Sequence, residues 1–267
     1  MEFVRQEPDL SYADYLRLDL ILSAQAPRSQ GHDEPLFIIM HQVMELWFRL
    51  ALHELVTARE HVKADELGAA SKMLTRVARI QQQMIGAWDV LATMTPTEYV
   101  DVRAGLGSSS GFQSEQNRLF EFMLGHKNAA AVAHQTTPEA RARLSTALEE
   151  PSLYDEALRL LHRRGFELPP EVTMRDWREP YAAHEAVTRA WTAVYRDPAS
   201  AWDLYDLAEK LVDLDYRFAQ WRFSHLKTVE RIIGFKRGSG GTAGTAYLAS
   251  IVNLRFFPEL LDLRTHL

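Results

Sequence analysis

The stretch LFIIMHQVMELWFRLALHELVTAREHV, residues 36–62, has an apolar side chain at nearly every third or fourth position. One stripe of such positions runs along it: Leu36, Met40, Val43, Trp47, Ala51 and Leu55. Because an α-helix turns once every 3.6 residues, side chains with this spacing share one face. The spacing therefore predicts a long helix with one face buried in a core.

Other helical patterns surround this stretch. A second apolar pattern covers about residues 65–91, and the segment from Pro198 to Ile233 has no Gly or Pro inside it, which predicts one very long helix. Helix starts are predicted at four capping sequences: Thr95-Pro96 with Glu98, Thr137-Pro138, Ser152 with Asp155, and Asp197-Pro198. Strand patterns are scarce, and no stretch resembles an interdomain linker. We therefore expect a single all-α domain over residues 1–267, a helical bundle of the kind that binds ligands between facing helices.

The composition is that of an ordinary globular protein, with 46% apolar and 25% charged residues. A formal net charge of −6 argues against nucleic acid as the main partner, which usually requires a basic surface. The chain has no Cys, which excludes disulfides and thiolate ligands and is typical of a reducing compartment. The first residues lack a signal peptide's apolar segment, and no run approaches the roughly 18 apolar residues of a membrane span. We therefore expect a cytoplasmic protein that is not in a membrane.

Two histidines lie on apolar helical stripes. His225 follows Trp221 by four residues, and His41 lies between Phe37 at i−4 and Met44 at i+3. Each pattern is compatible with a hydrogen-bonded core histidine. Two such residues on aromatic-rich helices also suit a haem site, because neutral imidazole is a good iron ligand and haem needs an apolar slot with one strong axial donor.

Other catalytic patterns fail on their context. Zinc suits the chain less well, because there is no Cys, no His-Glu-x-x-His motif and no close His pair. The sequence GSSSG at 107–111 matches the nucleophile elbow of serine hydrolases, but a helical pattern precedes it instead of a strand. The sequence GSGGTA at 238–243 matches a dinucleotide fingerprint, but it also follows a helical pattern. We therefore interpret residues 234–244, GFKRGSGGTAG, as a polar Gly-rich loop that does not bind a nucleotide.

Two groups of side chains suggest where an anion binds. On the helix predicted from Pro96, Tyr99 and Arg103 lie at i and i+4, where a hydroxyl and a guanidinium can bind a carboxylate. The alternative is a partly exposed helix whose Arg extends into solvent. Near the Gly-rich loop, a basic cluster either neutralises carboxylates or marks a solvated helix end: Arg222, Lys227, Arg231, Lys236 and Arg237.

Several segments together resemble the tryptophan 2,3-dioxygenase family. They occur in family order and span nearly the whole chain: YADYLRLD (12–19), FIIMHQVMELW (37–47), TPTEYVDVRAGLGSSSGFQS (95–114), WRFSHLKTVERIIGFKRGSGG (221–241) and FFPELLDLRT (256–265). The resemblance implies an all-helical protein that binds haem b, with ferrous iron in the active form, and that is usually a homotetramer. It also implies insertion of O2 across the indole C2–C3 bond of L-tryptophan, which gives N-formylkynurenine.

The resemblance also implies roles for particular positions. His225 is expected to be the proximal iron ligand, and His41 a distal histidine that bonds the indole N–H. Arg103 is expected to pair with the substrate carboxylate. Further expected contacts are Phe37 against the indole, the Tyr99 hydroxyl beside Arg103, Ser110 and Gly111 at the haem and oxygen pocket, Ser239 at the amino-acid group, and Tyr12, Tyr15 and Leu16. The last three lie in the N-terminal segment, about residues 1–30, which in this family reaches into a neighbouring subunit's site.

Some positions depart from the family pattern. Val43 and Met44 replace a usual Thr-Ser pair, Asn117 replaces an aromatic residue, and Ser239 replaces a usual Thr. None of them is the expected iron ligand or carboxylate clamp, so we expect haem binding. We also expect the Gly-rich loop to act as a lid over the haem pocket. The departures leave open a tryptophan derivative as substrate, or a monooxygenase that forms a 2-oxindole. A haem-binding sensor without catalysis is a third hypothesis, which the predicted amino-acid clamp disfavours.

Overall fold

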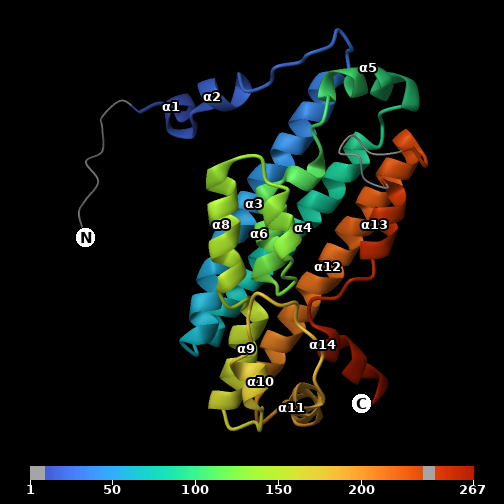
Figure 1. The fold of residues 1–267 in the computed structure, drawn as a ribbon. Coiled ribbons are helices and arrows are strands. Elements are labelled where there is room, and N and C mark those ends of the chain that lie inside the picture. Colours follow the sequence, from blue (N-terminus) through green and yellow to red (C-terminus); the bar gives the residue numbers. More distant parts are fainter. Residues whose placement is uncertain (1–9, 237–243) are drawn as a thin grey trace.

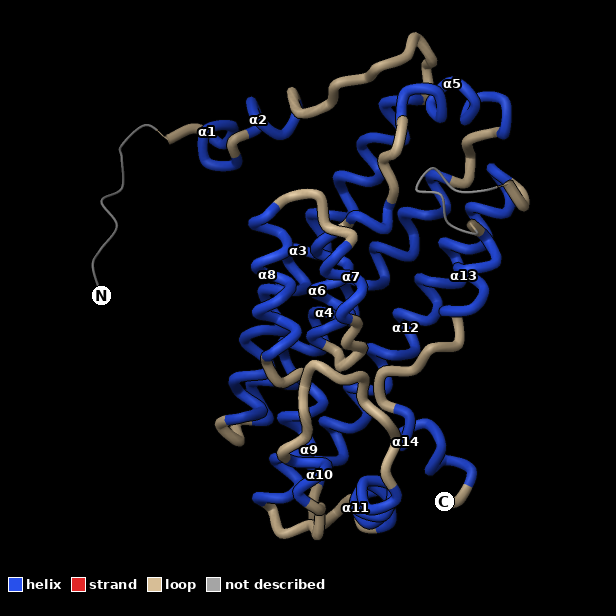
Figure 2. Tube along the Cα trace, in the orientation of Figure 1, coloured by secondary structure: helices blue, strands red, loops and turns tan. Residues whose placement is uncertain are grey.

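The computed structural model describes residues 10–236 and 244–267. Every regular element in this part of the chain is a helix, which confirms the all-α prediction (Figures 1 and 2). In chain order the elements are α1 (Tyr12–Leu16), α2 (Leu18–Leu22), α3 (Glu34–Lys63), α4 (Leu67–Leu91), α5 (Pro96–Leu106), the 3-10 helix η1 (Gly111–Gln113), α6 (Glu115–Met123), α7 (Ala129–Ala133), α8 (Pro138–Glu149), α9 (Leu153–Arg163), α10 (Pro170–Thr173), α11 (Glu185–Arg196), α12 (Trp202–Ile233), α13 (Thr245–Ile251), α14 (Pro258–Asp262) and the 3-10 helix η2 (Leu263–Thr265).

The three longest helices form the framework of the fold. α3 and α4 occupy the two stretches whose apolar patterns predicted them, and α12 is a single helix of 32 residues. α4 packs along both α3 and α12, and α6 and α9 also pack against α3 (Figure 1). The long helices therefore place residues from distant parts of the sequence side by side.

Side-chain caps begin several helices, as predicted. Thr95 accepts a hydrogen bond from the backbone N–H of Glu98 (3.4 Å), and the Glu98 carboxylate accepts one from the N–H of Thr95 (2.7 Å). Ser152 and Asp155 form the same reciprocal pair at the start of α9, and Thr137 caps α8. These bonds satisfy amide groups that a helix start leaves without helical partners.

The predicted start of the longest helix at Pro198 is wrong by four residues. α12 begins at Trp202, and residues 197–201 form a turn after α11. Asp197 already ends α11, so the Asp-Pro pair belongs to the turn between two helices. From there α12 runs unbroken to Gly234, whose φ of 64° is a conformation that glycine adopts readily.

The buried face of α3 differs in part from the predicted stripe. Ala51 and Leu55 are fully buried as predicted, whereas the four earlier positions are only partly buried: Leu36, Met40, Val43 and Trp47. Met44 and Phe48 are the buried apolar residues in this half of the helix. Because residues 36–52 are apolar on most faces, their spacing does not single out one face. The cavity described below is lined by other residues of this half of the helix, Phe37, His41 and Glu45.

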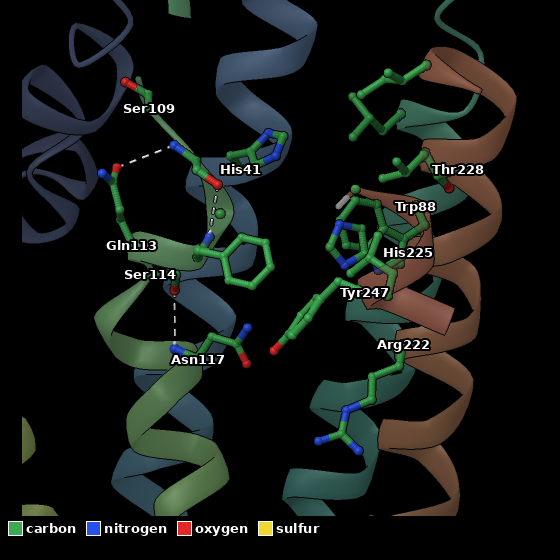
Figure 3. Close-up of a pocket in the computed structure, with 18 of the residues that line it drawn as sticks. His41, Trp88, Ser109, Gln113, Ser114, Asn117, Arg222, His225, Thr228 and Tyr247 are labelled. Carbon is green, nitrogen blue, oxygen red and sulfur yellow. Dashed lines mark hydrogen bonds between the residues drawn. The ribbon is translucent and has the colours of Figure 1, made fainter. Parts of the chain in front are cut away.

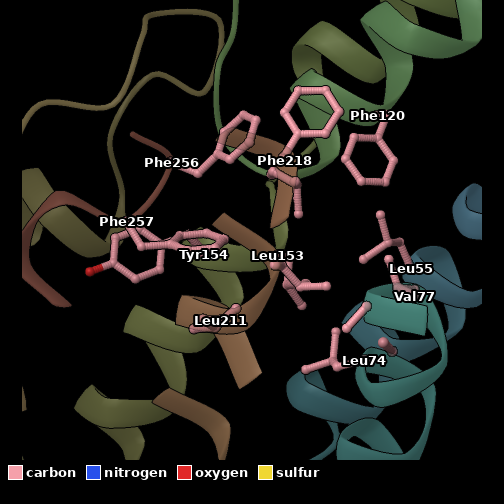
Figure 4. Close-up of a cluster of buried hydrophobic side chains, with 14 of the residues drawn as sticks. Leu55, Leu74, Val77, Phe120, Leu153, Tyr154, Leu211, Phe218, Phe256 and Phe257 are labelled. Atoms are coloured by element: carbon pink, nitrogen blue, oxygen red, sulfur yellow. The ribbon is translucent and has the colours of Figure 1, made fainter. Parts of the chain in front are cut away.

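One hydrophobic cluster joins the long helices to the C-terminal segment. Side chains from α3, α4, α6, α9, α12 and the segment before α14 meet at its centre: Leu55, Leu74, Val77, Phe120, Leu153, Tyr154, Leu211, Phe218, Phe256 and Phe257 (Figure 4). Each of them is at most 2% exposed. Their removal from water is the main term that stabilises this arrangement.

Two buried carboxylates attach the C-terminal segment to the helices. Asp215 of α12 accepts the backbone N–H groups of Phe256 (3.0 Å) and Phe257 (3.2 Å). Glu259 of α14 accepts the hydroxyl of Tyr154 (2.9 Å) and two further donors from the loop that leads into α11. These bonds offset the cost of removing the carboxylates from water, so the segment has a defined position against α9 and α12.

The N-terminal arm, residues 10–33, follows a path of its own. α1 and α2 extend away from the helical bundle (Figure 1). Six large apolar side chains of this region are exposed, whereas Leu16 and Leu18 are half-buried: Leu10, Tyr12, Tyr15, Leu20, Ile21 and Leu22 are the exposed ones. Further along the arm, Gln42 of α3 donates a hydrogen bond to the carbonyl of Ala24 (3.1 Å) and accepts one from Gln25 (2.7 Å). Within residues 10–236 and 244–267, most of the apolar side chains at the beginning of the arm therefore stay exposed.

In the described part of the chain, α3 is the one helix with the length and apolar composition of a membrane span. Core helices of globular proteins pass the same test, and α3 packs against α4, α6 and α9. Its composition alone therefore does not indicate a membrane.

A buried lysine closes the C-terminal end of α8. Lys127 is 1% exposed, and its ammonium group donates hydrogen bonds to the carbonyls of Ala147 and Glu150, the latter at 2.9 Å. A cation suits this end of a helix, where carbonyl groups lack helical partners. Burial is the main cause that lowers the pKa of Lys127, to about 8.

The lowered pKa of Lys127 predicts a pH-dependent stability. The pKa of Lys127 is about 8 in the folded protein, and its ordinary value is 10.5. At pH values between these two, the unfolded chain binds more protons than the folded one. The lysine's contribution to the free energy of unfolding should therefore increase over this window, by at most about 1.4 kcal/mol per pH unit. Denaturant unfolding of the wild-type protein and of Lys127→Met should show this difference. A difference between the two proteins that does not change with pH would contradict the prediction.

Candidate functional site

A cavity of about 480 Å³ lies between two walls of helices. One wall consists of α3 and the segment from η1 to α6, and the other consists of α4 and α12 (Figure 3). α5 and α13 supply further lining side chains. His41 and His225 face the space from opposite walls. A concave site with an aromatic lining and a few polar groups is typical of ligand binding.

Aromatic rings hold His225 on the α12 wall. Its ring stacks on Trp88 of α4, with 4.4 Å between centroids and 6° between planes, and Trp221 lies 5.6 Å away at the preceding turn of α12. Burial is the main cause that lowers the pKa of His225 to about 3, and His41 and Arg118 lower it further. At neutral pH this imidazole is therefore uncharged, the form that binds a metal.

His41 faces the cavity from α3. Its Nδ1 donates a hydrogen bond to the carbonyl of Phe37 (2.7 Å), and the two rings lie 4.2 Å apart. A carbonyl oxygen can only accept, so the proton of the neutral imidazole is on Nδ1 and Nε2 is an acceptor. Burial lowers the pKa of His41, while the bond to Phe37 and the charge of Glu45 act in the opposite direction. His41 thus presents an uncharged acceptor to the cavity.

A short polar turn completes the wall on the side of α3. Ser110 begins η1, where its hydroxyl accepts a bond from the N–H of Phe112 (3.4 Å). Ser114 then begins α6 and donates its own hydroxyl to Glu45 of α3 (2.6 Å). These bonds hold the turn against α3, and Ser110 and Gly111 line the cavity.

The predicted anion clamp lies on α5. Tyr99 is 9% exposed and lines the cavity, with its ring 6.2 Å from that of Phe37. Arg103, one turn further along α5, is partly buried, and it is not among the described side chains that line the cavity. Of the two predicted clamp residues, the structure therefore brings Tyr99 to the cavity.

The structure brings six of the predicted site residues to one cavity: Phe37, His41, Tyr99, Ser110, Gly111 and His225. Tyr12, Tyr15 and Leu16 lie in α1, which extends away from the bundle (Figure 1). Ser239, the contact predicted in the Gly-rich loop, lies outside the described residues. The structure thus gathers the residues predicted around the iron and the indole.

Among the described residues, the basic cluster predicted beside the Gly-rich loop is divided: Arg222 is buried, whereas Lys227, Arg231 and Lys236 are exposed. Arg222 is 2% exposed and pairs with Glu121 (3.0 Å) inside the protein. Lys227 pairs with an acidic neighbour on the surface, and Arg231 donates to the carbonyl of Ala92 (2.7 Å). Position 222 lies on a different side of the helix from positions 227 and 231, which are four residues apart and share one face, so Arg222 does not meet them. Arg237 lies outside the described residues.

Sequence reasoning missed several lining residues. Trp88 lies in the second long apolar pattern, where a Trp is most often a core residue, and its stack on His225 depends on the packing of α4 against α12. Tyr247 of α13 reaches the cavity beside Phe112, with 4.7 Å between their rings. Glu121 lines it from α6. Periodicity carried no signal for these contacts between segments.

The donor set of the cavity fits haem. In residues 10–236 and 244–267, no three His, Asp or Glu side chains gather as a metal-binding cluster. A single uncharged imidazole in an aromatic-lined cavity is the donor that haem iron needs on its proximal side. The stacking of Trp88 also fixes the plane of the His225 ring, as neighbours of metal-ligating histidines commonly do.

The pKa of His225 predicts that the cofactor-free protein loses stability in acid. The pKa of His225 is about 3 in the folded protein, and its ordinary value is 6.5. At pH values between these two, the unfolded chain binds more protons than the folded one. The free energy of unfolding should therefore fall as the pH decreases through this window. His225→Gln should remove up to about 1.4 kcal/mol per pH unit from this slope, measured by denaturant unfolding. His266→Gln, at an exposed position, is the control. Equal slopes in all three proteins would argue against an uncharged buried imidazole.

The chain is similar over its whole length to known tryptophan 2,3-dioxygenases. The family model described as tryptophan 2,3-dioxygenase matches residues 3–267. The tryptophan 2,3-dioxygenase of Erythrobacter litoralis is 57% identical over 258 residues, which cover 96% of this chain and 98% of the relative. That of Cupriavidus necator is 56% identical over 268 residues, covering 100% of this chain and 90% of the relative. The chain therefore belongs to the tryptophan 2,3-dioxygenase family.

Proposed function

We infer that this protein is a dioxygenase that oxidises L-tryptophan with O2 to N-formylkynurenine. Membership of the family supports this reaction. The observation that carries it in the structure is the pair of uncharged imidazoles on opposite walls of one cavity, His225 beside Trp88 and His41 with an acceptor nitrogen. One imidazole is suited to hold iron and the other to hold the substrate.

We propose His225 as the axial ligand of haem b. Its lowered pKa keeps the imidazole uncharged, and Trp88 and Trp221 orient the ring and exclude water from it. When bound, haem supplies the activation of O2, which no side chain of the protein can perform. Ser110 and Gly111 are proposed to line the space where O2 binds, across the cavity from His225. Both lie on the cavity wall beside α3.

His41 and Phe37 are proposed to position the indole. The indole N–H is a donor, and Nε2 of His41 is an acceptor because Nδ1 is bonded to the Phe37 carbonyl. The Phe37 ring, 4.2 Å from that of His41, offers an apolar surface for the indole. Tyr99 and Arg103 on α5 are proposed to bind the substrate carboxylate, which would fix the amino-acid end and hold the C2–C3 bond in place.

We further propose that the site is completed by other parts of the protein and by other copies of it. Ser239 is proposed to contact the amino-acid group of the substrate. The N-terminal arm is proposed to enter the site of a neighbouring subunit in a homotetramer, with Tyr12, Tyr15 and Leu16. The exposed apolar side chains of α1 and α2 support this proposal, because the described residues of their own chain do not cover them. A single domain and a cytoplasmic location stay predictions from the sequence.

Product analysis tests the function. Reduced protein loaded with haem, L-tryptophan and ¹⁸O2 should give a product that carries two labelled oxygen atoms. One labelled atom would indicate a 2-oxindole and a monooxygenase. Haem binding without any product would indicate a sensor. His225→Ala should lose the Soret band and the product together, whereas His41→Ala should keep the Soret band. A His225→Ala protein with full haem content would overturn the assignment of the axial ligand.

The proposed clamp predicts a loss of substrate capture without a loss of haem. Arg103→Leu removes hydrogen bonds to a charged group and should lower kcat/KM for L-tryptophan by about 10- to 100-fold. Tyr99→Phe removes one hydroxyl and should lower it by about 2- to 10-fold. Haem content, read from the Soret band, should stay at the wild-type level in both. Unchanged kcat/KM in Arg103→Leu would exclude Arg103 from the clamp.

A further inference from the structure

A buried ion triad lies at the end of the cavity away from α5. Glu121 of α6 is 4% exposed and pairs with Arg118 of the same helix (2.7 Å) and with Arg222 of α12 (3.0 Å). Arg118 is 9% exposed and Arg222 is 2% exposed. All three side chains line the cavity that also holds His225. Ionised groups this deeply buried are costly unless they are paired, so a triad at this place calls for an explanation.

Arg222 also holds a third segment of the chain. Its second terminal nitrogen donates to the carbonyl of Leu254 (2.9 Å), in the segment between α13 and α14. The guanidinium lies over the rings of Phe218 (4.7 Å) and Phe256 (5.0 Å). One side chain therefore connects α12 with α6 through Glu121, and with the C-terminal segment through a backbone bond.

The position of this connection matters for the site. Arg222 precedes His225 by three residues on α12, and α6 belongs to the opposite wall of the cavity, the one beside α3 (Figure 3). The pair between Glu121 and Arg222 thus crosses from one wall to the other at one end of the space. A buried guanidinium–carboxylate contact has a defined geometry, so it restricts how far the two walls can separate.

We propose that Arg118, Glu121 and Arg222 form a positioning triad, which ties the two walls together and sets the electrostatic potential at the His225 imidazole. This inference rests on the proposed role of His225 as the haem ligand. The residues of the triad act through the walls and through their charge, and none of them is assigned a contact with substrate.

Other charged groups around the triad define its electrostatic setting. Asp215, on the same helix as Arg222, is buried and lies close enough for Arg222 to oppose the rise of its pKa. Burial is the main cause that lowers the pKa of His126, on which the charges of all three members of the triad also act, so His126 adds no charge at neutral pH. Arg118 contributes to the lowered pKa of His225. The charge of Arg118, which Glu121 links to that of Arg222, therefore acts on the proposed ligand, because charges in a buried site are weakly screened.

Two charge-removing variants give the decisive test. Glu121→Gln removes a negative charge and should raise the reduction potential of the bound haem, because the ferric state carries the greater positive charge. Arg222→Met removes a positive charge but keeps a long side chain against Phe218 and Phe256, and it should lower the potential. Spectroelectrochemical titration measures both. A purely structural disturbance has no reason to move the potential in opposite directions in the two variants.

Further variants separate geometry from charge. Arg222→Lys keeps the charge but loses the forked donor that serves Glu121 and Leu254 at once. Its potential should stay near the wild-type value, while haem transfer to apomyoglobin should become about 10- to 100-fold faster. Glu115→Gln is the matched control, because Glu115 lies on the same helix and pairs with the exposed Arg143. It should change neither quantity.

The outcomes are distinct. Opposite shifts in Glu121→Gln and Arg222→Met, with faster haem loss in Arg222→Lys, support the triad. Shifts in the same direction, or shifts no larger than that of Glu115→Gln, overturn it, as does haem loss from Arg222→Lys at the wild-type rate. Thermal unfolding of the cofactor-free variants, followed by circular dichroism, shows that each protein compared is folded. Failure of the wild-type protein to bind haem would instead contradict the proposed function, not the triad alone.

Discussion

The packing of α4 against both α3 and α12 is the contact on which the site depends. Packed helices approach to about 8–10 Å between their axes. Because α4 packs along both long helices, α3 and α12 need not pack on each other where the cavity lies, and their histidines face a shared space. Trp88 belongs to this same helix, so the element that holds the walls in place also orients the ring of His225.

Buried polar groups occur where distant segments of the chain meet. Asp215 bonds the segment before α14, Glu259 joins α14 to α9, and Lys127 closes the end of α8. Arg222 connects α12 to α6 and to the C-terminal segment. Apolar packing supplies most of the stabilisation but tolerates small displacements, whereas hydrogen bonds from buried charges require particular partners. These groups therefore specify which segments lie together.

Apolar spacing and capping sequences predicted the helices whose position depends on residues close together in the chain. The caps at Thr95 and Ser152 and the extents of α3 and α4 follow from residues within one or two helical turns. The burial of Arg222 could not be predicted from nearby residues, because its partner Glu121 is 101 residues away. From spacing alone, His41 and His225 were each compatible with a core residue and with a residue of a haem site. The resemblance to a family marked them as site residues, and the fold placed them on facing walls.

The attachment of the C-terminal segment has a consequence for the order of events during synthesis. α13 contributes Tyr247 to the cavity, and the bonds from Asp215 and Glu259 hold the residues that follow it. These residues follow α3, α4 and α12 in the chain, so the ribosome makes them later than the long helices. A nascent chain can form α3 and α4 early, because domains fold as their residues emerge. It cannot complete the cavity until α13 and α14 have also emerged, so the pocket is finished only after all three long helices have been made.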